Sequence, residues 1–308
     1  MRTTFVRTLA RLAEKDPNLI LLTGDLGFTV FEDFRARFPN QLLNVGIAEQ
    51  NMIGVAAGLA LSGKRVFVYS IVPFVTFRCL EQIRNDLCHQ HLPVCIVGVG
   101  GGYSYGHLGA THHALEDLGV MRTMPNMTVV SPGDPWEVEQ AVLALGTLNG
   151  PGYLRLGKNK EPLLHQPATI SEFVLGKSIV MRGGDDVTIL ATGTMLETAL
   201  LAAALLESKK IQSTVISVHT LKPIDRQGIL AAADNKKLLI TIEEHGPFGG
   251  LADAISRIIA EEGLPVQFLP ITAPESIDVV TGSHSHFRSV AGLTAEKISA
   301  RILERLKK

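Results

Sequence analysis

The sequence predicts an α/β protein with two domains. Short apolar segments alternate with amphipathic stretches along most of the chain, and this alternation is typical of parallel strands joined by helices. The chain has 308 residues, enough for two domains with separate cores. A third observation is a break in the alternation between residues 149 and 167. We therefore expect a first domain over residues 1–165, a linker over 166–180 and a second, smaller domain over 181–308.

The first domain begins with a helical pattern and continues as repeated strand and helix units. Its expected strands are apolar runs flanked by Gly and Pro, which suits strands buried on both faces. These runs are Leu19 to Thr23, Arg65 to Tyr69, Val94 to Val99 and Thr128 to Ser131. Helical patterns cover Phe5 to Lys15, Asn51 to Ser62, Phe77 to Gln90 and Pro135 to Leu145. This order predicts a parallel sheet covered by helices on both faces.

The segment from Asn149 to Pro167 interrupts this order. It starts with Asn-Gly-Pro-Gly and contains further Gly, Lys and Pro, a composition typical of turns and connections. We interpret it as a crossing between domains. A second series of units follows, with strands expected over Val187 to Ala191, Ser213 to Val218 and Leu238 to Glu243. Its helices are expected over Leu196 to Ser208, after Asp225 and from Gly250.

The overall composition excludes several classes of protein. There are 29 Lys and Arg against 30 Asp and Glu, so no electrostatic case exists for binding nucleic acid or an anionic membrane. No apolar run approaches the roughly 20 residues that span a bilayer, and the N-terminus has no signal-peptide core. Cys79, Cys88 and Cys95 are too widely spaced for a CxxC site. They indicate buried thiols in a reducing, cytoplasmic setting.

One acidic residue of the first domain has unusual surroundings. Glu49 precedes the small, apolar segment Met52 to Leu61, which is rich in Gly and Ala. A carboxyl group at the start of such a helix loses hydration and can share a proton near neutral pH. The small side chains let the helix approach another backbone or a ligand closely. Glu49 is therefore a candidate catalytic residue, and the competing interpretation is a buried, hydrogen-bonded acid at a helix start.

A glycine-rich loop with three histidines follows the strand at 94–99. Its start, Gly98-Val99-Gly100-Gly101-Gly102, lacks the GxGxxG spacing of a nicotinamide site, although glycines at a strand end suit close approach of the backbone to a ligand. His107, His112 and His113 lie within seven residues of one another. No Cys or carboxylate stands at a matched spacing, so we expect no metal centre here.

Three segments of the chain resemble the transketolases that use thiamine diphosphate. They are Gly46-Ile47-Ala48-Glu49-Gln50-Asn51 with the apolar run behind it, Gly106-His107-Leu108-Gly109-Ala110-Thr111-His112, and Glu243-Glu244-His245-Gly246-Pro247-Phe248-Gly249-Gly250. The resemblance extends over nearly the whole chain from Arg2. It implies a parallel-sheet, pyrimidine-binding domain followed by a smaller α/β transketolase C-terminal domain. In the third segment we expect an interface or helix-capping role rather than a metal or acid–base site.

The resemblance implies cofactor contacts in the first domain. Glu49 would bond to the pyrimidine ring of thiamine diphosphate and activate the cofactor. Ile71, Phe74 and Phe77 match the apolar pocket for that ring, where aromatic side chains stack on a flat heterocycle. Asp25 would approach the cofactor across a subunit interface, and a turn-forming Asp is the alternative interpretation.

The resemblance also implies contacts with the substrate. His112 would act in catalysis by stabilising the charge that develops on a substrate oxygen. Four further residues match or lie near substrate-binding positions, the lysine and arginines serving an anionic terminus: His107, Arg155, Lys158 and Arg2. Leu108 stands where transketolases acting on phosphorylated ketoses have an Asp, so the resemblance does not identify the substrate.

No segment matches the GDG…N motif with which this family holds Mg²⁺ and the diphosphate. The resemblance therefore implies the C-terminal subunit of a split transketolase, in which a separate N-terminal subunit holds Mg²⁺ and this chain holds no metal. The expected assembly is a heterotetramer that transfers a two-carbon ketol unit from a ketose to an aldehyde. Three alternatives stay open: a 1-deoxyxylulose 5-phosphate synthase-like enzyme, the β subunit of a 2-oxoacid dehydrogenase, and a non-catalytic partner subunit.

Overall fold

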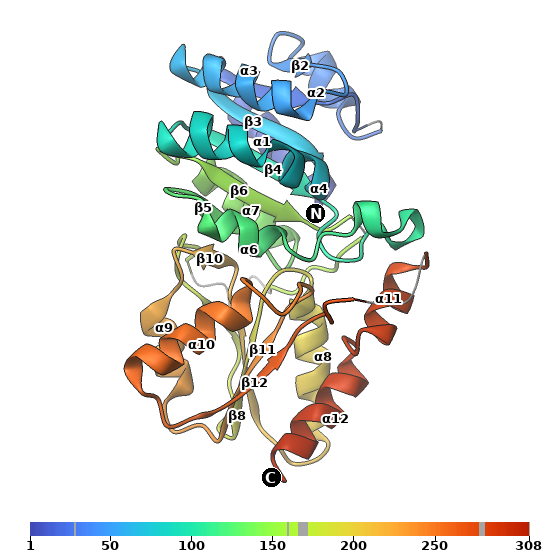
Figure 1. Cartoon of the computed structure of the whole chain (residues 1–308), viewed down its shortest axis with the longest axis vertical. Helices are drawn as coiled ribbons and strands as arrows, with labels where there is room; N and C mark the ends of the chain where they lie inside the picture. Colours follow the sequence, from blue (N-terminus) through green and yellow to red (C-terminus); the bar gives the residue numbers. More distant parts are fainter. Residues whose placement is uncertain (28, 159, 166–171, 277–280, 308) are drawn as a thin grey trace.

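Two largely parallel sheets, stacked along the long axis of the molecule, form the body of the protein (Figure 1). The computed structural model describes residues 1–307 except 28, 159, 166–171 and 277–280. The first sheet has the strand order β10-β5-β6-β4-β3-β1-β2 and the second has the order β12-β11-β8-β9-β7. Two edge strands, β10 and β7, pair antiparallel with their neighbours, and the other described pairs are parallel. The expected α/β class is confirmed.

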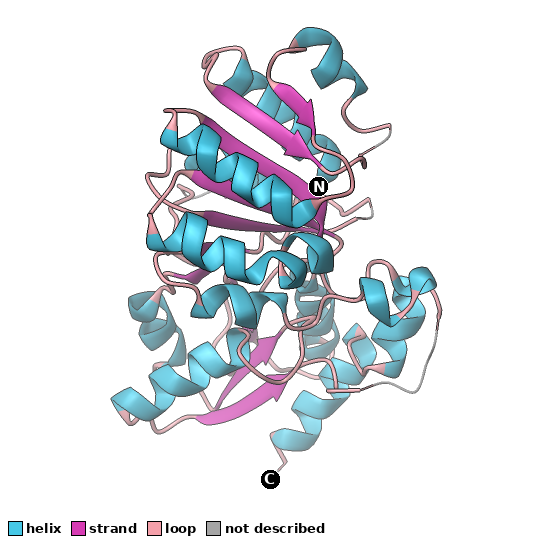
Figure 2. Cartoon of the chain, turned by 45° about the horizontal axis from the view of Figure 1, so that its top comes forward, coloured by secondary structure: helices cyan, strands magenta, loops and turns pink. Residues whose placement is uncertain are grey.

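Helices cover both faces of the first sheet (Figure 2). Successive side chains of a strand point to opposite faces. Leu21 therefore packs with α1 and α7, whereas its neighbour Leu22 packs with α3 on the other face. The strands are β1 (Leu19–Thr23), β2 (Leu42–Asn44), β3 (Arg65–Ile71), β4 (Val94–Val99), β5 (Thr128–Val130), β6 (Gly152–Leu156) and β10 (Thr220–Lys222). The helices are α1 (Arg2–Ala13), α2 (Glu32–Arg37), α3 (Glu49–Leu61), α6 (Asp117–Thr123) and α7 (Pro135–Leu145).

The second sheet is covered in the same way. Ile189 packs with α8 and α12, and Leu190 packs with α9 and α10 in a core cluster that continues into the first sheet. The strands are β7 (Ile179–Arg182), β8 (Val187–Ala191), β9 (Ser213–Ser217), β11 (Leu238–Ile242) and β12 (Gln267–Ile271). The helices are α8 (Met195–Glu207), α9 (Arg226–Ala233), α10 (Leu251–Glu262), α11 (His284–Val290) and α12 (Ala295–Arg305).

The segment expected to cross between the domains contains a central strand instead. All five residues of β6 are buried, and β6 lies between β5 and β4. The sequence does not show the apolar run expected of a buried strand, because Gly and Pro precede β6 and the charged Arg155 lies within it. Of the expected linker 166–180, residues 166–171 lie outside the described residues, and Ile179 and Val180 already belong to β7.

The helix expected over Phe77 to Gln90 is a series of short turns with different windings. It begins earlier than expected, with α4 (Val72–Val75), and continues through the 3₁₀ turn η1 (Phe77–Cys79), α5 (Leu80–Gln82) and the π-helix η2 (Ile83–His89). Changes of winding of this kind are frequent at functional sites. Residues 100–116 between β4 and α6 form the histidine loop. It contains two further 3₁₀ turns, η3 (Gly106–Leu108) and η4 (Ala110–His112).

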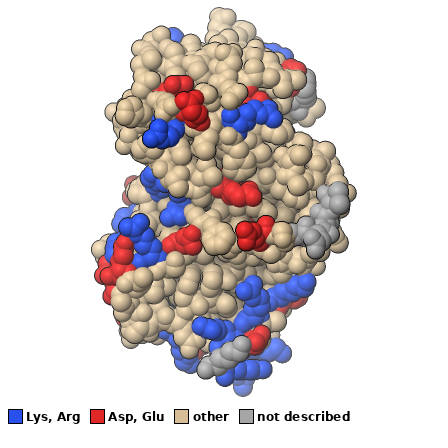
Figure 3. Space-filling view, in the orientation of Figure 1, with Lys and Arg blue, Asp and Glu red and all other residues tan. Residues whose placement is uncertain are grey.

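The surface carries both signs of charge. On the face shown in Figure 3, acidic side chains are scattered, and Lys and Arg are most numerous at the lower end, where α12 lies. None of the helices in the described part of the chain is long and apolar enough to cross a membrane.

Candidate active site

Glu49 is the first residue of α3, and only 3% of its surface is exposed. Gly24, which follows β1, lies against it: a Cβ at Gly24 would stand 3.8 Å from Glu49 Cγ and 3.2 Å from the carbonyl oxygen of Gly46. Arg78 Nη1 donates a hydrogen bond of 2.7 Å to Glu49 Oε2, and the Arg78 side chain is 45% exposed. The buried carboxylate is thus paired with a guanidinium whose side chain reaches the surface.

Aromatic rings continue outward from this ion pair. The guanidinium carbon of Arg78 lies 4.6 Å from the centre of the half-buried Phe74 ring. The Phe74 ring centre is 5.1 Å from that of His112, with an angle of 71° between the ring planes. Ile71 and Phe77 are half-buried on either side of α4 in the sequence. The fold therefore brings together side chains from α3, α4 and the histidine loop that lie far apart in the sequence.

Positive charge gathers next to His112. Lys158 Nζ lies 4.0 Å from the centre of the Tyr105 ring, and the His112 ring lies 6.0 Å from the same ring. His107 is exposed, 6.3 Å from Tyr105 between ring centres. Burial lowers the pKa of Lys158, and the positive charge of Arg2 lowers it further, so Arg2 belongs to the same group. Such a cluster attracts an anionic group.

The surroundings of His112 favour its neutral form. Burial lowers the pKa of His112, and the nearby charges of His107 and Lys158 lower it further. A neutral imidazole has one nitrogen that donates and one that accepts a hydrogen bond. The Thr111 hydroxyl lies 3.0 Å from His112 Nδ1, which leaves Nε2 available to a ligand.

Lys158→Met is expected to raise the pKa of His112 toward the ordinary histidine value, because removing a neighbouring positive charge makes protonation of the imidazole less costly. The measurement is an NMR titration of the His112 ring carbons. Lys209→Met, which removes an exposed charge after α8, should leave the titration unchanged. An unchanged His112 pKa in Lys158→Met contradicts the placement of the two side chains.

Arg155, predicted to bind an anionic substrate, forms an ion pair in the interior of the protein. It is 7% exposed, and its Nε and Nη2 donate hydrogen bonds of 2.9 Å each to the two carboxylate oxygens of Asp117. The Tyr153 hydroxyl donates to the same carboxylate at 2.6 Å, and Arg155 Nη2 also donates to the carbonyl oxygen of Ala114 at 2.7 Å. These bonds give Arg155 a structural role in the interior, and its expected contact with a substrate stays a prediction.

The glycine-rich loop makes room for side chains of this chain. A Cβ at Gly101 would stand 2.4 Å from Arg155 Nε, and one at Gly102 would stand 2.5 Å from Glu244 Cδ. Gly102 also has a φ of +65°, which favours glycine. The space beside these two glycines is therefore filled by an arginine and a glutamate of this chain, and the expected approach of a ligand to this part of the loop stays a prediction.

Glu244 connects the histidine loop to the second sheet. Its Oε1 accepts a hydrogen bond of 2.8 Å from the Tyr103 backbone N–H and lies 2.7 Å from His284 Nε2, while Arg288 Nε donates to Oε2 at 2.8 Å. Burial acts to raise the pKa of Glu244, but Arg288 and His284 outweigh it and hold that pKa well below its usual range. The carboxylate is thus a structural anchor for the loop.

The neighbours of Glu244 in the sequence are also structural. Glu243 accepts hydrogen bonds from the backbone N–H groups of Leu251 and Ala252 at 2.7 and 2.8 Å. These bonds satisfy N–H groups that have no partner within a helix start. The expected helix-capping role is confirmed for Glu243 at α10. In the part of the chain that the structure describes, no group of His, Cys, Asp and Glu is arranged to hold a metal ion.

Asp25 forms the turn after β1. Its backbone has a φ of +55°, and its N–H donates to Asn44 Oδ1 at 2.9 Å. The amide nitrogen of Asn44 donates back to Asp25 Oδ1 at 3.0 Å. These bonds support the turn-forming interpretation. Asp25 is exposed, and its contact with a cofactor stays a prediction.

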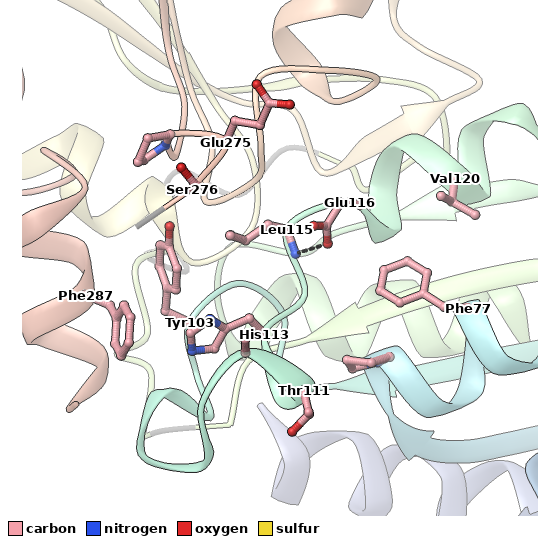
Figure 4. Close-up of a pocket in the computed structure, with 13 residues that line it drawn as sticks. Phe77, Tyr103, Thr111, His113, Leu115, Glu116, Val120, Glu275, Ser276 and Phe287 are labelled. Atoms are coloured by element: carbon pink, nitrogen blue, oxygen red, sulfur yellow. Dashed lines mark hydrogen bonds between the residues drawn. The ribbon is translucent and has the colours of Figure 1, made fainter. Parts of the chain in front are cut away.

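Phe77, the histidine loop and residues of the second domain border a cavity of about 660 Å³ (Figure 4). It is large enough for a small organic ligand. Phe77 and Thr111 border it, and Glu49 is not among the residues that line it. Other lining residues come from the histidine loop and the second domain: Tyr103, His113, Leu115, Glu116, Pro274, Glu275, Ser276 and Phe287.

Sequence reasoning missed Arg78. An arginine beside an aromatic residue in an amphipathic stretch has no distinguishing pattern, because its acidic partner lies 29 residues away. Only the packing of α4 and η1 against α3 brings the two together.

Two family models match the chain. Residues 1–162 match "Transketolase, pyrimidine binding domain", and residues 176–298 match "Transketolase, C-terminal domain".

Curated and solved proteins are similar over nearly the whole length. An apulose-4-phosphate transketolase subunit from Phocaeicola vulgatus is 39% identical, covering 100% of this chain and 97% of that protein. The 6-deoxy-6-sulfo-D-fructose transketolase subunit SqwH of Clostridium sp. is 36% identical, covering 97% and 92%. A solved split gene transketolase, described as an inactive beta4 tetramer, superposes with a TM-score of 0.88 at 34% identity, covering 99% of this chain and 97% of that one.

Proposed function

Because the chain belongs to the transketolase family, we propose that it is the C-terminal subunit of a thiamine diphosphate-dependent transketolase. The enzyme transfers a two-carbon ketol unit from a ketose to an aldehyde. The observation that carries the proposal is the buried carboxylate of Glu49, which Arg78 connects to the half-buried Phe74 ring, with His112 beside that ring. The full-length similarity to proteins described as transketolase subunits supports it.

The residues present fit one half of the cofactor. Thiamine diphosphate, when bound, supplies the carbon nucleophile that breaks and forms the bond next to the carbonyl. A buried acid beside aromatic rings suits the flat, basic pyrimidine. Within the described residues no metal-ligating group is present, so a separate N-terminal subunit is proposed to hold Mg²⁺ and the diphosphate. The two subunits are proposed to form a heterotetramer in the cytoplasm, with which the three free, buried cysteines are compatible.

Each residue of this chain has a distinct proposed role. Glu49 holds and moves the proton at the ring nitrogen of the pyrimidine. Phe74, Phe77 and Ile71 hold the ring and exclude water from it, and Asp25 approaches the cofactor across a subunit interface. His112, being neutral, donates a hydrogen bond to the substrate oxygen that gains negative charge.

The substrate is proposed to have an anionic terminus. Lys158 and Arg2 place positive charge next to His112, and the exposed His107 lies beside the same group. Charge-assisted hydrogen bonds from a lysine and an arginine hold phosphate or sulfonate oxygens. The two similar subunits are named for a sugar phosphate and a sulfo-sugar. The buried pairing of Arg155 with Asp117 favours a structural role for that residue.

The test is a transfer assay on the assembled enzyme. This chain, the candidate N-terminal subunit and their mixture are each incubated with Mg²⁺, thiamine diphosphate, an aldehyde acceptor and one of a panel of donors. The donors are ketose phosphates, sulfo-ketoses and pyruvate, and products are identified by mass. Two-carbon transfer by the mixture alone supports the proposal. Release of CO₂ from pyruvate with condensation would indicate the deoxyxylulose phosphate synthase-like alternative. A stable complex without either reaction would favour the non-catalytic partner.

A further inference from the structure

Arg78 makes two contacts that a bound pyrimidine ring would also make. Its guanidinium donates to the Glu49 carboxylate at 2.7 Å and lies over the Phe74 ring, with 4.6 Å from its central carbon to the ring centre. A guanidinium is flat, carries several N–H groups along its edges and stacks on aromatic faces. An aminopyrimidine is also flat and presents nitrogen atoms along one edge. The two groups therefore compete for one carboxylate and one ring face.

We propose that Arg78 is an internal stand-in for the cofactor, whose guanidinium occupies the pyrimidine position on Glu49 and Phe74 in the empty subunit and is displaced when the cofactor binds. The inference rests on the proposed function, because it takes the pyrimidine site to be at Glu49. It adds a step that the site residues alone do not imply, since the site must open before it can be filled.

Burial of Glu49 explains why the empty subunit needs such a group. A carboxylate removed from water is costly unless it is paired, and Glu49 is 3% exposed. Burial raises the pKa of the neighbouring Cys79 thiol to about 12, with the negative charge of Glu49 as a further cause. The carboxylate of Glu49 thus lies in poorly hydrated surroundings. Among the described side chains, Arg78 is the one that forms an ion pair with it.

Arg78 can leave the site without a rearrangement of the fold. It lies in the 3₁₀ turn η1 at the surface, with 45% of its side chain exposed. Long cationic side chains keep their apolar stem on the protein while the charged end moves into water. The guanidinium is therefore readily hydrated after displacement, and the cofactor then supplies the partner for Glu49.

The consequence is a lower apparent affinity for the cofactor. If only the open fraction of molecules binds, the apparent Kd is the intrinsic Kd divided by that fraction. With Arg78 on Glu49 in about nine of ten empty molecules, Arg78→Gln lowers the Kd for thiamine diphosphate about tenfold. If Arg78 instead supported Glu49 in the bound state, the same substitution would weaken binding, so the direction of the change decides between the two roles.

The experiment is a calorimetric titration of thiamine diphosphate, at fixed Mg²⁺, into the complex of this chain with its N-terminal subunit. Wild type, Arg78→Gln and Arg78→Lys are compared with Arg84→Gln, a matched control that removes an exposed arginine within η2 whose described bond is to Asn85. We expect a tighter Kd for Arg78→Gln, an intermediate Kd for Arg78→Lys, which keeps the charge but lacks the flat group, and no change for the control.

A second readout is the thermal midpoint of the complex without cofactor. Arg78→Gln should lower it, because Glu49 is left unpaired, and in a Glu49→Gln background the same substitution should have little effect. An unchanged or weaker Kd for Arg78→Gln in a complex that binds the cofactor overturns the stand-in role alone. Failure of the wild-type complex to bind the cofactor overturns the proposed function and this inference together.

Discussion

Glu49→Gln is expected to lower the kcat of the assembled enzyme by about 10²- to 10⁴-fold, the contribution typical of a positioned acid or base. The amide has nearly the same size and shape as the carboxyl group but cannot take up or release a proton near neutral pH. Glu49 is buried at the first residue of α3, so water cannot easily replace it as the proton carrier. The measurement is steady-state turnover of the variant in complex with the N-terminal subunit.

The loss of activity must be separated from a loss of structure. Circular dichroism and the size of the complex should match those of the wild type, since Gln occupies the same space. Glu207→Gln is the matched control, because it removes an exposed carboxylate at the end of α8 that pairs with Arg182. Its kcat should be unchanged. Full activity of Glu49→Gln in an intact complex would rule out the proposed role of Glu49.

Arg155→Leu is expected to lower the free energy of unfolding by about 3–5 kcal/mol, as for other buried ion pairs broken on one side. The substitution leaves the Asp117 carboxylate buried with only the Tyr153 hydroxyl of its present side-chain partners. It also removes the hydrogen bonds to the carbonyl oxygens of Ala114 and Glu244, which link β6 to the histidine loop and the second domain. Urea unfolding of this chain measures the effect.

An exposed ion pair provides the comparison. Arg257 is 80% exposed and bonds to Glu261 at 2.6 Å one helical turn away, an arrangement worth about 0.3–0.5 kcal/mol. Arg257→Leu should therefore change stability little. If Arg155→Leu is as stable as the wild type and the assembled variant loses affinity for its substrate, the structural role assigned to Arg155 is wrong and the substrate-binding prediction regains support.

Sequence patterns predict the buried elements of this fold closely. Expected and observed bounds agree for β1 (Leu19–Thr23), β4 (Val94–Val99), β8 (Val187–Ala191) and α7 (Pro135–Leu145). Parallel strands buried on both faces are continuous apolar runs, and α7 starts with an Asp134 cap followed by Pro135. The pattern fails at β6, where Arg155 is buried only because Asp117 neutralises it.

The candidate site divides in the same way. Resemblance to a family points to Glu49, Phe74 and His112. In the fold, Phe74 lies against His112 and is connected to Glu49 through Arg78. The resemblance cannot show which acidic residue each arginine pairs with, because partners that are distant in the sequence meet only in the folded chain. Arg155, expected to be available to a ligand, is engaged by Asp117, and Arg78, to which no role was assigned, contacts Glu49.

The central claim is that this chain supplies the pyrimidine half of a site completed by another subunit. It is tested most directly by calorimetric titration of thiamine diphosphate with Mg²⁺ into this chain, into the N-terminal subunit and into their mixture. We predict tight, stoichiometric binding in the mixture and none to this chain alone. Tight binding to this chain alone, or no binding to a mixture whose subunits associate, would contradict the account.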